Sequence, residues 1–255
     1  LWQEIFGQGI VVTSEDFGIM GMPPTHPELL DWLAVEFRDS GWDLKKLIKL
    51  FVTSRTYRQA AVTTAEKLTQ DEDNRFLSRG PRFRMDAEMV RDYALAASGL
   101  LSSSTGGPGV RPYQPSDIWN VVGLPGGNTR NYKQDTGEKL YRRTLYSFWK
   151  RMAHPPNMEA FNAPSREVCT VRRERTNTPL QALVTMNDPQ FVEAARTLAQ
   201  GALQRAEGAE SVALEYVATR VLCRPLKPQE IAILKASLAD HLTYYKANLT
   251  DANAL

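Results

Sequence analysis

Arginine and uncharged hydrogen-bonding residues are most concentrated between Arg166 and Leu183, in the segment REVCTVRRERTNTPLQAL. Each guanidinium presents a planar fork of N–H donors that fits the oxygens of carboxylate, phosphate or sulfate. This composition predicts a surface that binds an anionic ligand. We expect three arginines to hold the anion and two side-chain amides to orient it: Arg172, Arg173, Arg175, Asn177 and Gln181.

The helix expected next in the chain favours the same chemistry. Thr178 followed by Pro179 is typical of an N-cap with proline at the first helical position, and helix N-termini attract anions. The alternative is structural: these arginines pair with carboxylates of the chain, such as Glu167 and Glu174, and tie irregular loops together. The sequence leaves both interpretations open.

Catalysis has weaker candidates. His154 is the histidine near the basic segment, and together with a carboxylate such as Asp188 it could transfer protons as a general acid or base. His26 is expected to cap or pack a helix. No two histidines stand at the i, i+4 spacing that places two metal ligands on one helix face, so we expect no metal site.

The two cysteines form no CxxC motif, which argues against a zinc or redox motif. Cys169 lies among arginines, which would stabilise a thiolate nucleophile, although burial as a small hydrophobe is an alternative. Whether Cys169 and Cys223 form a disulfide stays open. The chain also lacks CxxCH, so we expect no cofactor in this segment.

Composition describes a globular chain of 255 residues, 42% of them hydrophobic, with a formal net charge of +2. Residues 130–175 carry eleven Lys or Arg and five Asp or Glu, an excess of +6 that could attract an anionic partner. No nucleic-acid-binding signature occurs, and no apolar run approaches the ~20 residues of a membrane span. Because the chain starts without methionine, we expect a fragment of a longer protein.

Helices are predicted by capping residues and apolar periodicity. A T-x-x-E capping box at Thr25 should open a helix that ends near Ser40, and Asp43 should cap the next. Four further helices are expected after Thr178, and the last of them should bury an apolar face, as should the first. The later predicted ranges are residues 85–101, 179–186, 189–203, 212–222 and 228–246.

The middle of the chain should be irregular. Glycine and proline are frequent from Gly106 to Gly127, and the segment NYKQDTGEKLYRRTLYSFWKR that follows predicts a β-hairpin with its turn at Asp135–Glu138. We therefore expect a mainly α fold: an irregular helical domain with one β-hairpin and long Gly/Pro-rich loops. The whole chain is treated as one domain, with 1–105 and 106–255 as possible sub-lobes.

Four segments together carry a family resemblance: GQGIVVTSEDFGIMGMPPTHPELLDWLAVEF, WDLKKLIKLFVTSRTYRQ, YRRTLYSFWKR and REVCTVRRERTNTPLQALVTMNDPQFVEAAR. From about Leu1 to Lys246 the chain resembles the planctomycete-specific family called domain of unknown function 1553. Members are typically the C-terminal part of large exported proteins, often after a second uncharacterised domain and a cytochrome c-like domain. The resemblance implies an extracytoplasmic setting, periplasmic or at the cell surface, with haem upstream of this segment.

Three hypotheses of function follow. In the first, the module binds an anionic ligand, such as a sulfated or carboxylated polysaccharide, or docks the neighbouring cytochrome-bearing domain through its arginine surface. In the second, it is a hydrolase or a redox-partner enzyme that uses His154 and a carboxylate. In the third, it is a scaffold in which these polar groups satisfy one another. The partners expected are the upstream domains and an anionic polysaccharide, and neither nucleic acid nor a membrane span.

Overall fold

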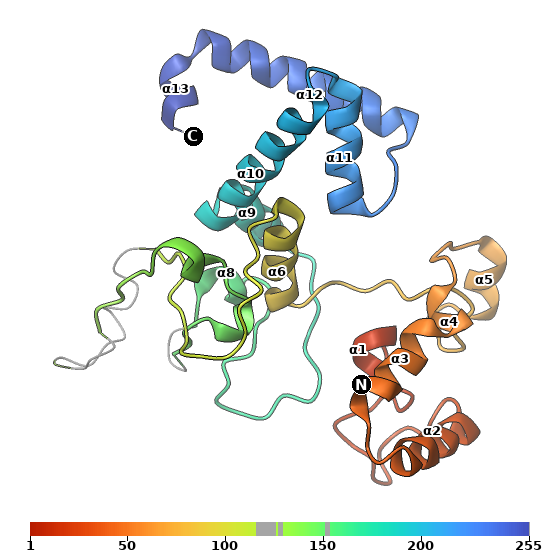
Figure 1. The fold of residues 1–255 in the computed structure, drawn as a ribbon. Coiled ribbons are helices and arrows are strands. Elements are labelled where there is room, and N and C mark those ends of the chain that lie inside the picture. The colour runs from red at the N-terminus through yellow and green to blue at the C-terminus, as the bar shows by residue number, and fades with distance from the viewer. Residues whose placement is uncertain (116–125, 127–129, 151–153, 255) are drawn as a thin grey trace. The chain divides into compact units, whose positions relative to one another are not determined.

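The computed structural model describes residues 1–115, 126, 130–150 and 154–254 (Figure 1). The chain forms two compact units. Unit 1 consists of Leu1–Met85 and Arg166–Thr176, and unit 2 consists of Asp86–Ser165 and Asn177–Leu255. The chain thus passes from unit 1 to unit 2 after Met85, whereas the sequence suggested a division at residue 105. The arginine segment returns to the unit that is built from the start of the chain.

Helices provide almost all the regular structure of the described residues, which confirms the mainly α fold. Unit 1 contains α1 (Trp2–Phe6), α2 (Pro27–Asp39), α3 (Leu44–Thr53), α4 (Arg55–Arg58) and α5 (Ala65–Gln70). Unit 2 contains α6 (Ala87–Ser98), the 3-10 helices η1 (Gly137–Tyr141) and η2 (Thr144–Tyr146), α8 (Pro156–Glu159), α9 (Pro179–Asn187), α10 (Pro189–Ala206), α11 (Glu210–Leu222), α12 (Pro228–Ala247) and α13 (Leu249–Ala254).

Side-chain caps begin three helices of unit 1, namely α3, α4 and α5. The Asp43 carboxylate accepts the Lys46 N–H at 3.0 Å, as expected for the cap of α3. The capping box predicted at Thr25 is wrong: α2 has His26 as its N-cap and makes no side-chain capping bond. The Thr25 hydroxyl instead lies 2.8 Å from His26 Nδ1 and 3.2 Å from the Ile10 carbonyl oxygen, so it joins the preceding loop to the helix.

The four helices predicted after Thr178 are all present as α9 to α12. The expected burial of an apolar face on the last one is wrong, because no residue of α12 is buried and Ile233 is 69% exposed. Its apolar residues are distributed around the helix rather than gathered in one stripe, so no single face can be covered by one neighbour. An ion pair of 3.4 Å between Lys235 and Glu210 connects α12 to α11.

The predicted hairpin is not confirmed in the described part of its segment. The 3-10 helices η1 and η2 lie where its second strand was expected, and Ser147 forms only an isolated bridge with Val110. This backbone does not pair with a strand because its carbonyl oxygens have another donor. The carbonyl oxygens of Leu140 and Arg142 accept hydrogen bonds from the side chain of Arg91 in α6. Residues 116–125 and 127 of the glycine-rich loop lie outside the described residues.

Unit 1 has an aromatic core. Its buried residues come from the first helix, the following loop, α2 and α3, and they are Phe6, Ile10, Leu33, Leu47 and Phe51. The Trp2 and Phe6 rings stack with centroids 4.1 Å apart, and Trp2 meets Phe51 edge to face at 5.3 Å. Aromatic pairs in these geometries add to the stabilisation from burial. The N-terminal helix is thereby fixed on α3.

A loop after α5 is organised by the buried carboxylate of Asp71. This carboxylate accepts the backbone N–H groups of Phe76 and Ser78, both at 3.2 Å. Arg79 donates to the Asp71 carbonyl oxygen at 2.7 Å, and its backbone N–H donates to the Asn74 side chain at 3.1 Å. These bonds fold residues 71–79 into a fixed loop without regular secondary structure.

Unit 2 is built around the buried side chain of Arg91, which is 2% exposed. Its guanidinium donates to the carbonyl oxygens of Leu140 at 2.8 Å and Arg142 at 2.9 Å, to the Thr144 hydroxyl at 3.0 Å, and to the Gln190 side chain. One side chain therefore ties α6 to η1, η2 and the start of α10. Burial lowers the pKa of Arg91 to about 10, which still leaves the guanidinium charged at neutral pH.

Hydrogen bonds around this site extend the connection. The Asp92 carboxylate accepts the Thr144 hydroxyl at 2.6 Å and its backbone N–H at 2.7 Å. Arg142 donates to the Pro108 carbonyl oxygen at 2.9 Å and lies 3.8 Å from the centroid of the Tyr146 ring. Pro108, in the described start of the glycine-rich loop, is thus held by the Arg142 side chain.

We predict that Arg91→Met destabilises unit 2 by about 3–5 kcal/mol, because several buried acceptors lose their donor and the Asp92 carboxylate loses the positive charge 3.8 Å away. Urea unfolding, with hydrogen exchange followed in α6 and α10, measures the loss. Arg143→Met is the matched control: its side chain is 61% exposed and lies 3.3 Å from the same Asp92, so it should cost under about 1 kcal/mol. Equal losses for the two variants would contradict the role of Arg91.

We also predict a pH dependence from Asp71. Burial opposes its ionisation, but the N–H groups of Phe76 and Ser78 outweigh burial and lower the pKa of Asp71 below its ordinary value. A lowered folded pKa stabilises the fold above the unfolded pKa of about 3.9, and this contribution is lost as pH falls through the folded pKa. Asp71→Asn should therefore lower the urea midpoint at pH 7 and lose less stability between pH 4 and 2. Asp73→Asn, at an exposed position of the same loop, should leave both unchanged.

Candidate functional site: an arginine-lined pocket in unit 1

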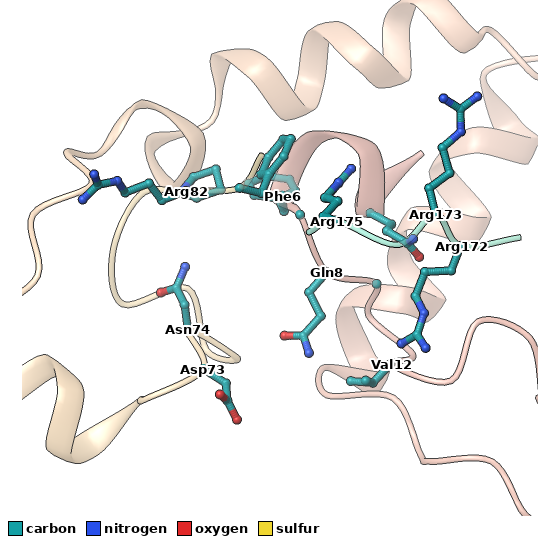
Figure 2. A pocket seen from close by; sticks show the side chains of 14 residues that line it. Phe6, Gln8, Val12, Asp73, Asn74, Arg82, Arg172, Arg173 and Arg175 are labelled. Atoms are coloured by element: carbon teal, nitrogen blue, oxygen red, sulfur yellow. The ribbon is translucent and has the colours of Figure 1, made fainter. Parts of the chain in front are cut away.

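Unit 1 contains an open pocket of about 500 Å³ (Figure 2). Its lining comes from the end of α1, the loop that follows, the Asp71 loop with the segment after it, and the arginine segment 172–175. The residues are Gln3, Phe6, Gly7, Gln8, Gly9, Val12, Asp73, Asn74, Pro81, Arg82, Phe83, Arg172, Arg173 and Arg175. Four arginines thus face one cavity with a single carboxylate, that of Asp73.

The end of α1 sets one wall of the pocket. Gly7 terminates this helix with φ 84°, a left-handed conformation that glycine adopts without strain. A Cβ atom at this position would lie 2.8 Å from a ring carbon of Phe83. Glycine therefore allows the Phe83 ring to lie directly against the helix end, and the helix end and this ring together form an apolar part of the wall.

The Asp71 loop supplies the opposite wall. Asn74 has φ 54°, a conformation that asparagine tolerates better than most residues. Its side-chain amide donates to the Arg79 carbonyl oxygen at 3.0 Å, so the hydrogen bonds within the loop fix its position. Figure 2 shows Gln8 projecting between this wall and Arg172. The side chain of Gln8 therefore contributes an amide to the lining of the pocket.

The arginine segment runs along the pocket in an irregular, extended conformation. Arg172 forms an ion pair of 3.4 Å with Glu15, and the two side chains are 57% and 50% exposed. Arg175 lies over the Phe83 ring, 4.6 Å from its centroid. In Figure 2 the Arg172 and Arg173 side chains point in opposite directions, and Arg82 extends away from both. The four arginines therefore line the cavity, but their guanidinium groups do not converge on one point.

The structure separates the residues that the sequence grouped together. Arg172, Arg173 and Arg175 line this pocket, whereas Asn177 and Gln181 belong to unit 2. Asn177 is exposed. Gln181 is buried, forms the capping box of α9 with the N-cap Thr178, and donates to the Ala160 carbonyl oxygen at 3.1 Å. The predicted cap of α9 is confirmed, and Gln181 serves that cap.

The two catalytic candidates lie in unit 2 and make different contacts. The His154 ring stacks on Trp149 with centroids 5.9 Å apart, and its Nε2 lies 3.7 Å from a Glu159 carboxylate oxygen. Asp188 caps α10 by accepting the Gln190 N–H at 3.0 Å, and it also accepts the Asn157 side-chain amide at 3.0 Å. Burial raises the pKa of Asp188. Each group therefore has a structural role in its own surroundings.

The structure also describes the cysteines and allows a search for metal sites and membrane-spanning helices. Cys169 and Cys223 are free, exposed thiols, so Cys169 is not the buried residue considered above. Within the described parts of the chain, no three His, Cys, Asp or Glu side chains gather as a metal site would require. Of the helices that the structure describes, none combines the length and the apolar character needed to cross a bilayer.

Sequence reasoning missed the larger part of the pocket, the eleven lining residues that come from residues 3–12 and 73–83. One signal was available: the segment SRGPRFR, residues 78–84, holds three arginines next to a phenylalanine. The sequence gives no signal for Gln3, Gln8 and Asp73, because they are ordinary polar residues of a helix or a loop. Their part in the pocket depends on the folding of the Asp71 loop and of the chain after α1.

Comparison with protein families places the chain. A family model described as PSD1, Protein of unknown function (DUF1553), matches residues 1–238. Neither the curated proteins nor the solved structures contain a match. The match extends over both units of the structure, including every residue that lines the arginine pocket. The chain therefore belongs to the DUF1553 family.

Proposed function

We propose that unit 1 binds an acidic saccharide chain, carrying sulfate or carboxylate groups, in the arginine-lined pocket. One observation carries the proposal: Arg82, Arg172, Arg173 and Arg175 line a single cavity of about 500 Å³ in which the only carboxylate is that of Asp73. Guanidinium groups bind carboxylate and sulfate oxygens through paired N–H donors. The volume lies within the ~300–1,000 Å³ range of ligand pockets.

The surroundings of the arginines support binding rather than a purely structural role. Glu167 and Glu174, the carboxylates considered as their partners, are both exposed, so an ion pair with either of them is open to solvent and weak. The ion pair between Arg172 and Glu15 is itself half exposed, and pairs of this kind contribute only about 0–1 kcal/mol. An incoming anion can therefore replace or join Glu15 at little cost.

The spread of the charges favours an extended ligand over a single small anion. Because the guanidinium groups point in different directions (Figure 2), one sulfate could contact only a few of them, whereas a chain with several acidic groups could contact more. The side-chain amides of Gln3 and Gln8 can exchange hydrogen bonds with sugar hydroxyls, since an amide both donates and accepts. Phe83 is 37% exposed and adds apolar surface to the pocket beside the Arg175 guanidinium.

The family resemblance suggests the setting. We expect this binding to take place outside the cytoplasm, in a longer protein whose upstream domains carry the haem. An acidic polysaccharide at the cell surface would then be held by this module. The binding site itself requires no cofactor, because arginine and amide side chains supply its chemistry.

We predict that the parent chain binds sulfated and carboxylated oligosaccharides with millimolar or better affinity, and that binding weakens as salt screens the arginines. Isothermal titration calorimetry at low and physiological ionic strength measures this, with a neutral oligosaccharide of equal length as the ligand control. Inorganic sulfate should bind more weakly than the oligomers. Sulfate binding as tight as theirs would contradict the extended ligand.

The arginine variant tests the site itself. Arg172→Ala, Arg173→Ala and Arg175→Ala combined should abolish binding while the melting temperature stays close to that of the parent. The matched control removes the same charge from three exposed arginines of unit 1 that do not line the pocket: Arg38, Arg55 and Arg58. Equal loss of binding in both variants would show that binding depends on the net charge of unit 1 and not on the arginines of the pocket. A large fall in melting temperature, without binding by the parent, would refute the proposal.

A further inference from the structure

A loop of unit 1 between α1 and α2 presents large apolar side chains to solvent. Phe17 is 77% exposed, Met20 is 87% exposed, and Ile19 is as exposed as in an extended chain. Met22 follows with 45% exposure. Single exposed apolar residues are common on soluble proteins, but several that adjoin one another mark an interaction surface.

This loop is held in its conformation by its own hydrogen bonds. The Thr13 hydroxyl accepts the Met22 N–H at 2.9 Å, and the Asp16 carboxylate accepts the Gly18 N–H at 2.7 Å. Gly21 is required by the close turn, because a Cβ atom there would lie 2.3 Å from the Asp16 carbonyl oxygen. The apolar side chains are thus presented by a preorganised loop, which lowers the entropy lost on binding.

Unit 1 also has an apolar groove between α2 and α3. Its volume is about 210 Å³, and its lining is Glu36, Phe37, Ser40, Lys46, Leu47, Lys49, Leu50 and Thr53. Phe37, Leu47 and Leu50 supply apolar side chains to this lining, and Lys46 and Lys49 supply two ammonium groups. Lys46 forms an exposed ion pair with Glu36 at 3.0 Å. The groove therefore combines apolar and cationic side chains in one lining.

We infer that the loop of one copy docks into the α2–α3 groove of a second copy. An apolar cavity of about 150 Å³ accepts benzene, so a groove of 210 Å³ has room for the Phe17 ring. The residues before Phe17 are Glu15 and Asp16, whose carboxylates would meet Lys46 and Lys49. Size and charge both match, and neither surface is covered within unit 1.

The contact joins different surfaces of the two copies, the loop of one and the groove of the other. Each copy therefore has both a loop to donate and a groove to fill, and contacts of this type can repeat from copy to copy. One loop in one groove buries less area than a stable interface needs, so association should be weak and should rise with protein concentration. The contact shares one residue with the surroundings of the arginine pocket, because Glu15 is also the ion-pair partner of Arg172.

Sedimentation velocity of the full 255-residue chain over a range of concentrations tests the inference. The parent should show a rising average mass. Phe17→Ser removes the ring that enters the groove, and Leu50→Glu puts a negative charge in the groove. Each variant alone should therefore remain monomeric. An equimolar mixture should form a dimer, because one variant keeps an intact groove and the other an intact loop. Circular dichroism checks that both variants fold.

A control variant and a vesicle-binding assay complete the test. Ile233→Ser removes an equally exposed apolar residue from α12 and should associate like the parent. A monomeric parent at every concentration would overturn the inference, as would a mixture of the two variants that stays monomeric. If the monomeric parent instead sediments with phosphatidylcholine vesicles and Phe17→Ser does not, the loop binds lipid and the second copy is excluded.

Discussion

Arg91 carries a positive charge into the interior of unit 2, where a guanidinium left without acceptors would be costly. Backbone carbonyl oxygens, a hydroxyl and an amide from three separate elements surround it. The conformation of the chain around η1 and η2 follows from this constraint, because its carbonyl oxygens must face α6. A strand in the same place would direct those oxygens to a neighbouring strand and leave the guanidinium with too few acceptors.

Unit 1 is stabilised by an apolar core rather than by a buried arginine. Its core is aromatic and aliphatic, and its irregular loop is fixed by the carboxylate of Asp71. No buried arginine is needed to connect its elements. The arginines of the segment 172–175 are half buried or exposed, with side chains along a cavity. The same residue type thus organises the interior of unit 2 and provides charge at the surface of unit 1.

The distinction between those two roles rests on burial and not on residue type. A guanidinium with four buried acceptors cannot be offered to a ligand without losing them, whereas one paired with a half-exposed carboxylate can exchange partners. Gln181 and Arg172 illustrate the contrast within a short stretch of sequence. The amide serves a helix cap inside unit 2, and the arginine lines an open pocket in unit 1.

Sequence alone determined the helices and the arginine cluster, because caps, prolines and apolar periodicity act over a few residues: α3, α6 and α9 to α12 lie close to where they were predicted. Tertiary structure decided what depends on distant partners. It put 3-10 helices where a hairpin was expected, since Arg91 supplies donors from α6. It joined residues 73–83 to the arginines, and left Asn177 and Gln181 out of the pocket. No local pattern encodes such contacts, because each forms between segments far apart in the chain.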